Sequence, residues 1–210
     1  NASNSYSGIT TISAGTIAVT VNNALGTNGS GTTIGANGTL DLQNVTYSTT
    51  EALTVNGGTI KTSTGTSSFA GTISLGANST VDVGGTQLTL SGIISSSSTY
   101  SLTKTSSGKL VLSGNNTYSG GTILSTGSID VAHNNALGTG SLSLSASTTL
   151  FLENSISLAN NISLSGDATI QFNPITLEYL VVGAGGGGGN GYGSQGGGGA
   201  GGGMVLAGTV

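Results

Sequence analysis

Seven acidic side chains are the main groups in this 210-residue chain that could perform acid–base or metal chemistry. No two of them lie within eight positions of each other: Asp41, Glu51, Asp82, Asp130, Glu153, Asp167 and Glu178. Glycoside hydrolysis needs two facing carboxyl groups, and Ca²⁺ needs roughly six to eight oxygen ligands. Because the sequence does not group the acids, we predict no enzyme, no catalytic residue, no metal site and no cofactor.

The other reactive residue types are absent or isolated. The chain has no Cys and no Arg, and its lysines are Lys61, Lys104 and Lys109. Without thiols there is no disulfide framework or thiolate metal site. Without a basic cluster there is no footprint for nucleic acid, and no apolar run reaches the roughly 18 residues of a membrane span. We place the single histidine, His133, at a turn or on the surface.

Three acids share one local pattern, in which an Asp stands between two aliphatic residues: Asp41, Asp82 and Asp130. In an alternating strand this is the outward position, so we expect solvated charges that keep strand edges from pairing. The alternative is a row of carboxylates that binds Ca²⁺. The nonapeptide pattern of calcium-binding β-helices is absent, which favours the first interpretation.

The elements that carry these residues are built from small side chains. The chain holds 32 Ser, 32 Thr and 39 Gly, and only 5 % of its residues are charged, against about 25 % in an ordinary soluble domain. Short runs of period-two alternation predict half-buried strands, broken by glycine-containing turns: 10–19, 32–42, 51–62, 70–83, 109–114 and 168–172. No apolar period of 3.6 extends over ten residues, so we predict an all-β chain.

An internal duplication organises these strands. Residues 4–42 align with 116–152, so that Tyr6 matches Tyr118 and the identical NNALGT at 22–27 matches 134–139, each 112 positions apart. Closely spaced turns, scarce Pro and frequent Asn favour a β-solenoid over a sandwich. We predict about nine coils of roughly 20 residues over 1–174, and expect Asn side chains to form ladders at the corners. The six tyrosines could stack on sugars, but the equivalence of Tyr6 and Tyr118 favours packing at a coil edge.

Residues 88–150 carry a family resemblance. Leu102-Thr103-Lys104, Asn116-Thr117-Tyr118, Gly120-Gly121-Thr122 and Ala136-Leu137-Gly138 are similar to the passenger-associated transport repeat of bacterial autotransporter adhesins, and residues 4–42 resemble its second half. The resemblance implies a right-handed parallel β-helix on a secreted, surface-displayed protein. We expect the chain to start inside a repeat and the parent polypeptide to be longer at both ends.

After Pro174 the composition changes, and 15 of residues 183–203 are Gly. Residues 175–210 resemble the start of a glycine-rich domain of phage tail fibres and bacterial surface proteins, in which Gly runs form polyglycine-II helices. The alternative is a flexible Gly/Ser linker. The apolar segments on both sides of the glycine run favour order.

We therefore predict a structural segment of a long extracellular fibre or adhesin, a stiff non-catalytic stalk on the bacterial cell surface. Its expected partners are adjoining segments of the same long chain and other copies in a fibre. The alternative is a receptor- or glycan-binding module of a surface or phage-type fibre, whose partner is a glycan on a host or neighbouring cell. Neither function assigns a site residue.

Overall fold

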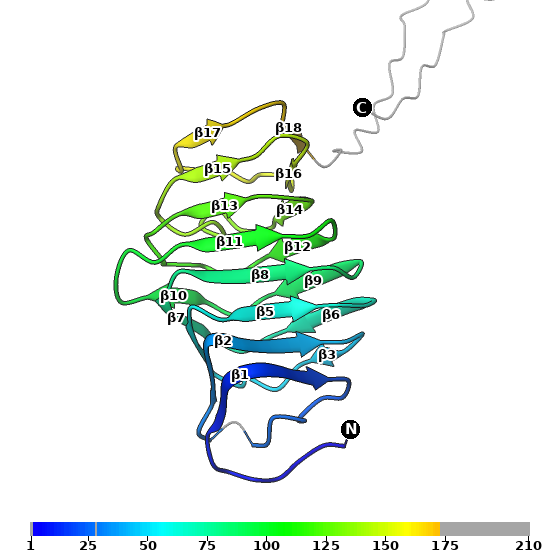
Figure 1. The fold of residues 1–210 in the computed structure, drawn as a ribbon. Helices are drawn as coiled ribbons and strands as arrows, with labels where there is room; N and C mark the ends of the chain where they lie inside the picture. The colour runs from blue at the N-terminus through cyan, green and yellow to red at the C-terminus, as the bar shows by residue number, and fades with distance from the viewer. Residues whose placement is uncertain (1, 28, 173–210) are drawn as a thin grey trace, which may run out of the picture. The chain divides into compact units, whose positions relative to one another are not determined.

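In the computed structural model, residues 2–27 and 29–172 are described. These residues form a stack of parallel β rungs that winds from Thr10 to Phe172 (Figure 1). No helix occurs in this part of the chain. The expected all-β solenoid is therefore confirmed for the described residues, whereas the glycine-rich module expected at 175–210 lies outside them.

Two parallel sheets make up the stack. The eleven-stranded sheet contains β10 (Ile94–Ser96), β7 (Ile73–Ala77), β4 (Leu53–Asn56), β2 (Thr32–Leu42), β5 (Thr59–Thr62), β8 (Ser79–Val83), β11 (Leu102–Thr105), β13 (Thr122–Leu124), β15 (Leu142–Leu144), β17 (Ile162–Leu164) and β1 (Thr10–Val19). The seven-stranded sheet contains β18 (Thr169–Phe172), β16 (Thr149–Leu152), β14 (Ser128–Val131), β12 (Lys109–Leu112), β9 (Gln87–Leu90), β6 (Thr66–Phe69) and β3 (Thr46–Tyr47).

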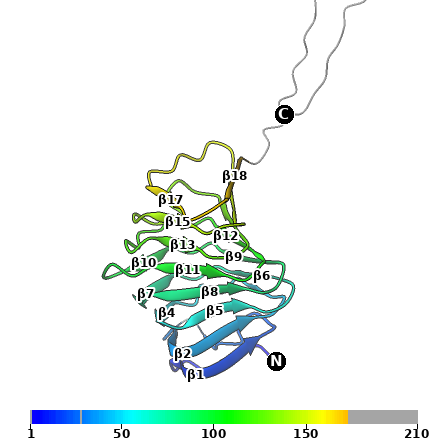
Figure 2. The ribbon, with the colours of Figure 1, turned by 45° about the horizontal axis from the view of Figure 1, so that its top comes forward.

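The long strand β2 divides the larger sheet into two walls. Its first residues, Thr32–Ile34, pair with β4, whereas Thr39–Asp41 pair with β5. The first wall therefore continues through β4, β7 and β10, and the second wall continues from β5 to β17. The seven-stranded sheet is the third wall, and it lies behind the second in Figure 2.

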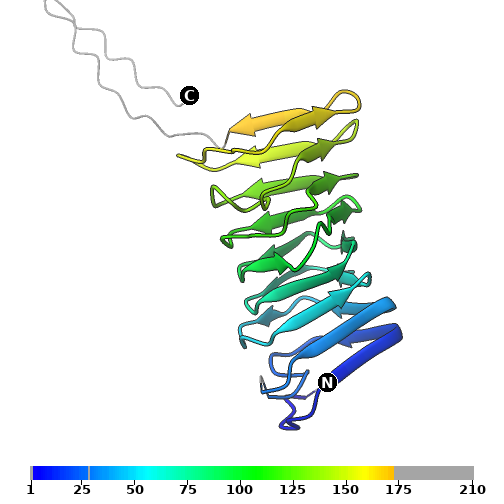
Figure 3. The ribbon, with the colours of Figure 1, turned by 90° about the vertical axis from the view of Figure 1, so that its left-hand side faces the viewer.

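From β4 onwards each coil adds one strand to the second wall and one to the third, whereas the strands of the first wall end with β10. The stacking of the coils is seen edge-on in Figure 3. Along the second wall, partner residues are 20 to 23 positions apart. The described stack has about eight turns. The expectation of about nine coils was thus too high, because several coils are longer than 20 residues and the first strand begins only at Thr10.

The core lies between the walls and is made by alternate residues of the short strands. Leu53, Ile73 and Ile94 stack in register on the first wall, and all three are buried. Tyr47 and Phe69 are register partners on the third wall, with ring centroids 5.6 Å apart. Successive side chains of a strand point to opposite faces of the sheet. The alternation of apolar and polar residues in the sequence therefore located these strands.

Candidate functional site

Asn116 joins three successive coils through a single buried side chain. Its Nδ2 donates to the carbonyl of Ala136 at 2.6 Å, one coil ahead. Its Oδ1 accepts from the backbone N–H of Ile94 at 2.7 Å, one coil behind. A buried amide that satisfies backbone groups on both sides fixes the spacing of the coils, because either group would be left unpaired without it.

Tyr118 forms the second polar contact of the same rung. Thr122 Oγ1 donates to the carbonyl of Leu137 at 3.1 Å, so the Tyr118 hydroxyl donates to Thr122 Oγ1 at 2.5 Å. The tyrosine ring is fully buried, and this burial raises the pKa of its hydroxyl. Gly138 lies against it with a φ of 67°, where an added Cβ would meet the Tyr118 carbonyl oxygen. We call residues 116–122 the Asn–Tyr rung.

The first copy of the duplication repeats these contacts. Asn4 Nδ2 donates to the carbonyl of Ala24 at 2.7 Å, and the Tyr6 hydroxyl lies 2.7 Å from Thr10 Oγ1. The backbone N–H of Thr27 donates to the Tyr6 carbonyl at 2.9 Å, as Thr139 does to Tyr118. The aligned residues of the two copies therefore form the same local structure. Its burial differs, since Tyr6 is 43 % exposed and Tyr118 is 0 % exposed.

Asparagines bind neighbouring coils at several other corners. Asn22 Oδ1 accepts from the backbone N–H groups of Ser48 and Thr49. Asn160 Nδ2 donates to the carbonyls of Gly138 and Gly140. The expected ladder of stacked amides is not seen among the described residues, in which the Asn135 to Asn115 contact at 2.9 Å is the one hydrogen bond between two Asn side chains. Most of these side chains therefore pair with backbone of the neighbouring coil rather than with another amide.

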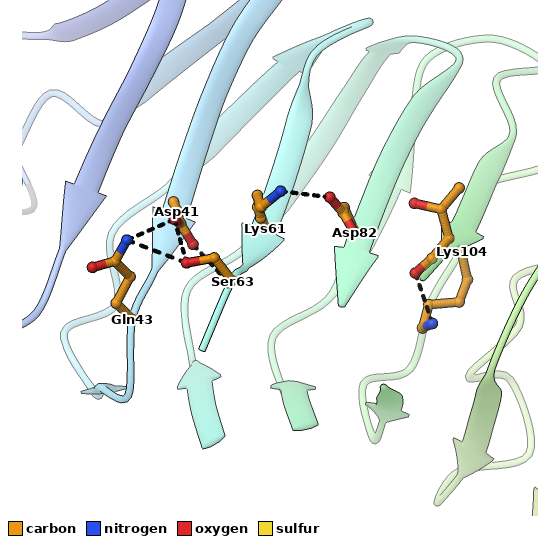
Figure 4. A network of polar contacts seen from close by, with 7 residues as sticks. Asp41, Gln43, Lys61, Ser63, Asp82 and Lys104 are labelled. Atoms are coloured by element: carbon orange, nitrogen blue, oxygen red, sulfur yellow. Dashed lines mark hydrogen bonds and ion pairs between the residues drawn. The ribbon is translucent and has the colours of Figure 1, made fainter. Parts of the chain in front are cut away.

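The charged side chains of the second wall form a row across the coils (Figure 4). Asp41 pairs in register with Lys61, and Lys61 pairs with Asp82, whose Oδ2 lies 2.9 Å from the lysine Nζ. Asp41 also accepts from the backbone N–H and the hydroxyl of Ser63. The hydrogen bond to Asp82 raises the pKa of Lys61. Because successive coils carry charges of opposite sign in this row, the charges attract one another and stabilise the stack.

The expectation that the three patterned aspartates are solvated was wrong for two of them. Asp41 is 4 % exposed and Asp130 is 6 % exposed. A turn of the next coil covers Asp41 and supplies Ser63 to its carboxylate. Asp130 lies on the third wall with Lys109 at 3.3 Å, apart from the second-wall row. The three acids therefore do not form one row of carboxylates.

Lys104 is fully buried at the end of β11. Its three Nζ donors reach the carbonyls of Thr105, Ser106 and Thr126 at 2.8, 2.7 and 3.1 Å, the last on the next coil. Burial lowers the pKa of the ammonium to about 8, against the raising effect of the Asp82 charge. A deprotonated lysine could be a nucleophile, but this one has no exposed surface. It therefore acts as a clamp between turns.

Glu51 is a fully buried acidic side chain, and the sequence analysis gave it no role. Its Oε1 accepts from the Thr32 hydroxyl at 2.7 Å, while its Oε2 is buried without a hydrogen-bond partner among the described residues. Burial raises the pKa of this carboxyl. The alternation over 51–62 puts Glu51 in phase with the buried Leu53 and Val55, so the pattern indicated an inward position that was not assigned to an acidic residue.

The structure also contains a ladder of threonines that was not predicted from the sequence. Along the second wall five threonines follow one another in register: Thr16, Thr39, Thr59, Thr80 and Thr103. The repeat runs across the strands, whereas a sequence displays only the pattern along a strand. The neighbouring outward column holds the Asp41, Lys61 and Asp82 charges, so the ladder is not part of a uniform threonine face.

The remaining sites offer little chemistry. His133 Nδ1 accepts from the backbone N–H of Asn135 within a turn. In the parts of the chain that the structure describes, no three His, Cys, Asp or Glu side chains are grouped to hold a metal ion. The same residues contain no helix long and apolar enough to cross a membrane.

Two segments of the chain, residues 1–19 and 102–131, match the family model described as the passenger-associated-transport-repeat. The second segment contains Lys104 and the whole Asn–Tyr rung, and the first contains Asn4, Tyr6 and Thr10. The match supports an autotransporter-type passenger repeat at both copies. No curated protein and no solved structure matches the chain.

Proposed function

We propose that this segment is a stiff, non-catalytic stalk of a secreted bacterial surface protein, an adhesin or fibre of the autotransporter type. The observation that carries the proposal is the unbroken series of parallel rungs from β1 to β18, with passenger-repeat matches in two places. The resemblance to that family adds right-handed winding and display on the cell surface.

The mechanical role follows from how the coils are joined. Every strand pair among the described residues is parallel, so backbone hydrogen bonds run along the stack axis. Side chains add cross-coil bonds, among them those of Asn22 to Ser48 and Thr49 and those of Asn116 to Ile94 and Ala136. Each coil contacts only its neighbours, which lets such a stack lengthen by repetition without a new core.

The absence of catalysis is supported by the placement of the ionisable groups. Asp41, Asp82 and Asp130 are committed to serine or lysine partners, and Glu51 and Lys104 are buried. Along the second wall Lys61 stands in register between Asp41 and Asp82, so these two acids are not neighbours in the row, whereas a glycosidase needs its two carboxyl groups across one sugar bond.

A glycan-binding module is the second candidate, and one observation favours it. Tyr6 exposes 43 % of its surface, and aromatic rings are common platforms for sugar faces. Tyr47 and Tyr118, in contrast, are fully buried and cannot serve. Tyr192, which could belong to such a site, lies outside the described residues.

Glycan-array binding and polysaccharide hydrolysis by the full chain test the choice. The stalk predicts no saturable binding and no hydrolysis, and it predicts the same blank result for Tyr6→Ala and Tyr192→Ala. Saturable binding that either substitution abolishes would replace the stalk with the glycan-binding module. Release of reducing sugar would contradict both proposals.

A further inference from the structure

Three asparagines lie at the corner between the first and second walls, in three successive coils: Asn37, Asn56 and Asn78. All three are exposed. Asn37 and Asn56 are each followed by Gly, whereas Asn78 is followed by Ser79. The backbone nitrogen of the next residue can attack an Asn side chain, and a glycine carries no side chain that hinders the attack. The corner therefore holds two asparagines whose sequence permits this reaction.

The three amides differ in how they are held. Asn78 Oδ1 accepts from the backbone N–H of Ser101 at 2.9 Å, one coil ahead, which fixes its side chain. Asn56 has no equivalent contact. Within the described residues, neither its side chain nor the backbone N–H of Gly57 has a hydrogen-bond partner. Both reacting groups at Asn56 are therefore free to approach each other.

Packing separates the two Asn-Gly pairs. Gly57 lies between β4 and β5 with a φ of 84°, and an added Cβ there would meet the Cβ atoms of Ala36 and Ala77 at 3.6 Å, an ordinary contact distance. Gly38 is buried within β2, and an added Cβ there would lie 2.1 Å from the carbonyl oxygen of Ile12. The attack requires the glycine nitrogen to turn toward the Asn side chain, and the close packing of Gly38 hinders that turn.

We propose that Asn56 is a self-modification site, at which the chain converts its own amide into a carboxylate without an enzyme. The backbone nitrogen of Gly57 attacks Cγ of Asn56 and closes a succinimide ring. The side-chain nitrogen leaves as ammonia and takes the proton that the Gly57 nitrogen loses. Water then opens the ring at either carbonyl, which gives aspartate or isoaspartate, and no oxidant or reductant is consumed.

The product changes the first wall in two ways. Strands β4, β7 and β10 contain no charged residue, so the new carboxylate places a charge on a neutral face. Isoaspartate also adds a carbon atom to the main chain just before Gly57, and the next residue, Gly58, is tightly packed. A Cβ at Gly58 would lie 2.4 Å from the carbonyl oxygen of Gly35. We therefore expect the isoaspartate form to loosen β4 from its neighbours, whether the segment is a stalk or a binding module.

The test follows the reaction in the full, unaltered chain. The protein is incubated at neutral pH in water enriched in oxygen-18, and peptide mapping by mass spectrometry locates the label at each asparagine. We expect Asn56 to react roughly tenfold faster than Asn37 in the folded chain, because Asn37 reacts only after local opening. In urea, where the packing is lost, the two Asn-Gly pairs should react at the same rate. Asn78 should stay unmodified over the same period.

Two further measurements sharpen the result. Asn56→Gln, whose longer side chain would need a larger ring, should keep the fold and remove the labelling at this corner. Amide exchange in β4 should be faster in the purified isoaspartate form than in the original chain, with Asn37→Asp as the control for an added charge. Equal rates at Asn56 and Asn37 in the folded chain would overturn the proposal, because packing would then not select the site. Reaction of Asn56 that is roughly tenfold slower in the folded chain than in urea would also overturn it, because the corner would then hold the amide in place.

Discussion

Asn116 and Ala136 are neighbours across two coils, joined by a 2.6 Å hydrogen bond from the asparagine amide to the alanine carbonyl. The same amide group accepts from Ile94 on the other side. Backbone bonds hold the strands together, whereas this side chain holds a segment of the coil that is not in a strand. The stack is therefore pinned at its corners as well as along its walls.

Replacing Asn116 by Ala should lower the free energy of unfolding by about 2 kcal/mol or more. The substitution leaves the N–H of Ile94 and the carbonyl of Ala136 unpaired, and each unpaired buried group costs about 1–3 kcal/mol. Chemical denaturation measures the loss. The matched control is Asn4→Ala, which removes one bond at an exposed position and should cost clearly less. Equal losses for the two variants would contradict the pinning role.

Gly71 should not tolerate a methyl group. A Cβ at this position would lie 1.7 Å from the carbonyl oxygen of Glu51, and backbone cannot yield as a flexible side chain does. We expect Gly71→Ala to destabilise the chain by about 3 kcal/mol, within the range of severe overpacking. Gly8→Ala, which has open space around it, is the control for thermal unfolding. A Gly71→Ala chain as stable as this control would show that the coils are spaced more widely.

The buried ammonium of Lys104 should make stability rise with pH. Its pKa falls from 10.5 in the unfolded chain to about 8 in the folded chain. Between these values the unfolded chain binds the extra proton, so the free energy of unfolding increases as pH rises. We predict that the stability of the original chain relative to Lys104→Met grows from pH 8 to pH 10.5.

Lys61→Met is the control for that titration. The pKa of Lys61 is raised above 10.5, so its contribution is present throughout the same window and declines only at higher pH. Denaturation curves at several pH values compare the two variants. A difference between the original chain and Lys104→Met that does not change with pH would mean that Lys104 is solvated.

Glu51 should act in the opposite direction. Its folded pKa lies above the ordinary 4.5, so the folded chain binds the extra proton and stability is lost as pH rises through the folded pKa. Glu51→Gln has no such titration. We therefore expect the variant to equal the original chain near pH 4 and to exceed it at pH 7. Glu153→Gln removes an exposed charge and serves as the control; a pH-independent effect of Glu51→Gln would contradict the burial.

Much of the fold could be predicted from the sequence because the rungs are local. The alternation at 10–19 and 32–42 corresponds to β1 and β2 with the same bounds. The 112-residue offset located both copies of the Asn–Tyr rung, although it did not indicate that Tyr6 is exposed and Tyr118 buried. The difference in exposure depends on the coil that precedes Asn116, residues 92–115, and this coil is not part of the aligned segments 4–42 and 116–152.

The register between coils was the part that the sequence could not supply. Along the second wall, partner residues are separated by 20 to 23 positions, so no fixed period predicts that Asp41 meets Lys61 or that Thr39 meets Thr59. Burial of Asp41 depends on the turn of the next coil, which brings Ser63 over it. Lys104 was assigned to the repeat motif, but its three carbonyl partners come from turns whose shape only the fold determines.

The central claim is that the chain is a stack that lengthens by repetition along one axis. Residues 4–115 can be inserted again after Asn115, which keeps the junction at equivalent positions of the duplication. From β1 to β13 the second wall advances five rungs, so each inserted copy should lengthen the rod by about 24 Å at about 4.8 Å per rung. Electron microscopy of purified chains with one, two and three inserted copies measures this length. A linear increase at constant width is the result that we predict, and a width that grows while the length stays constant would contradict the claim.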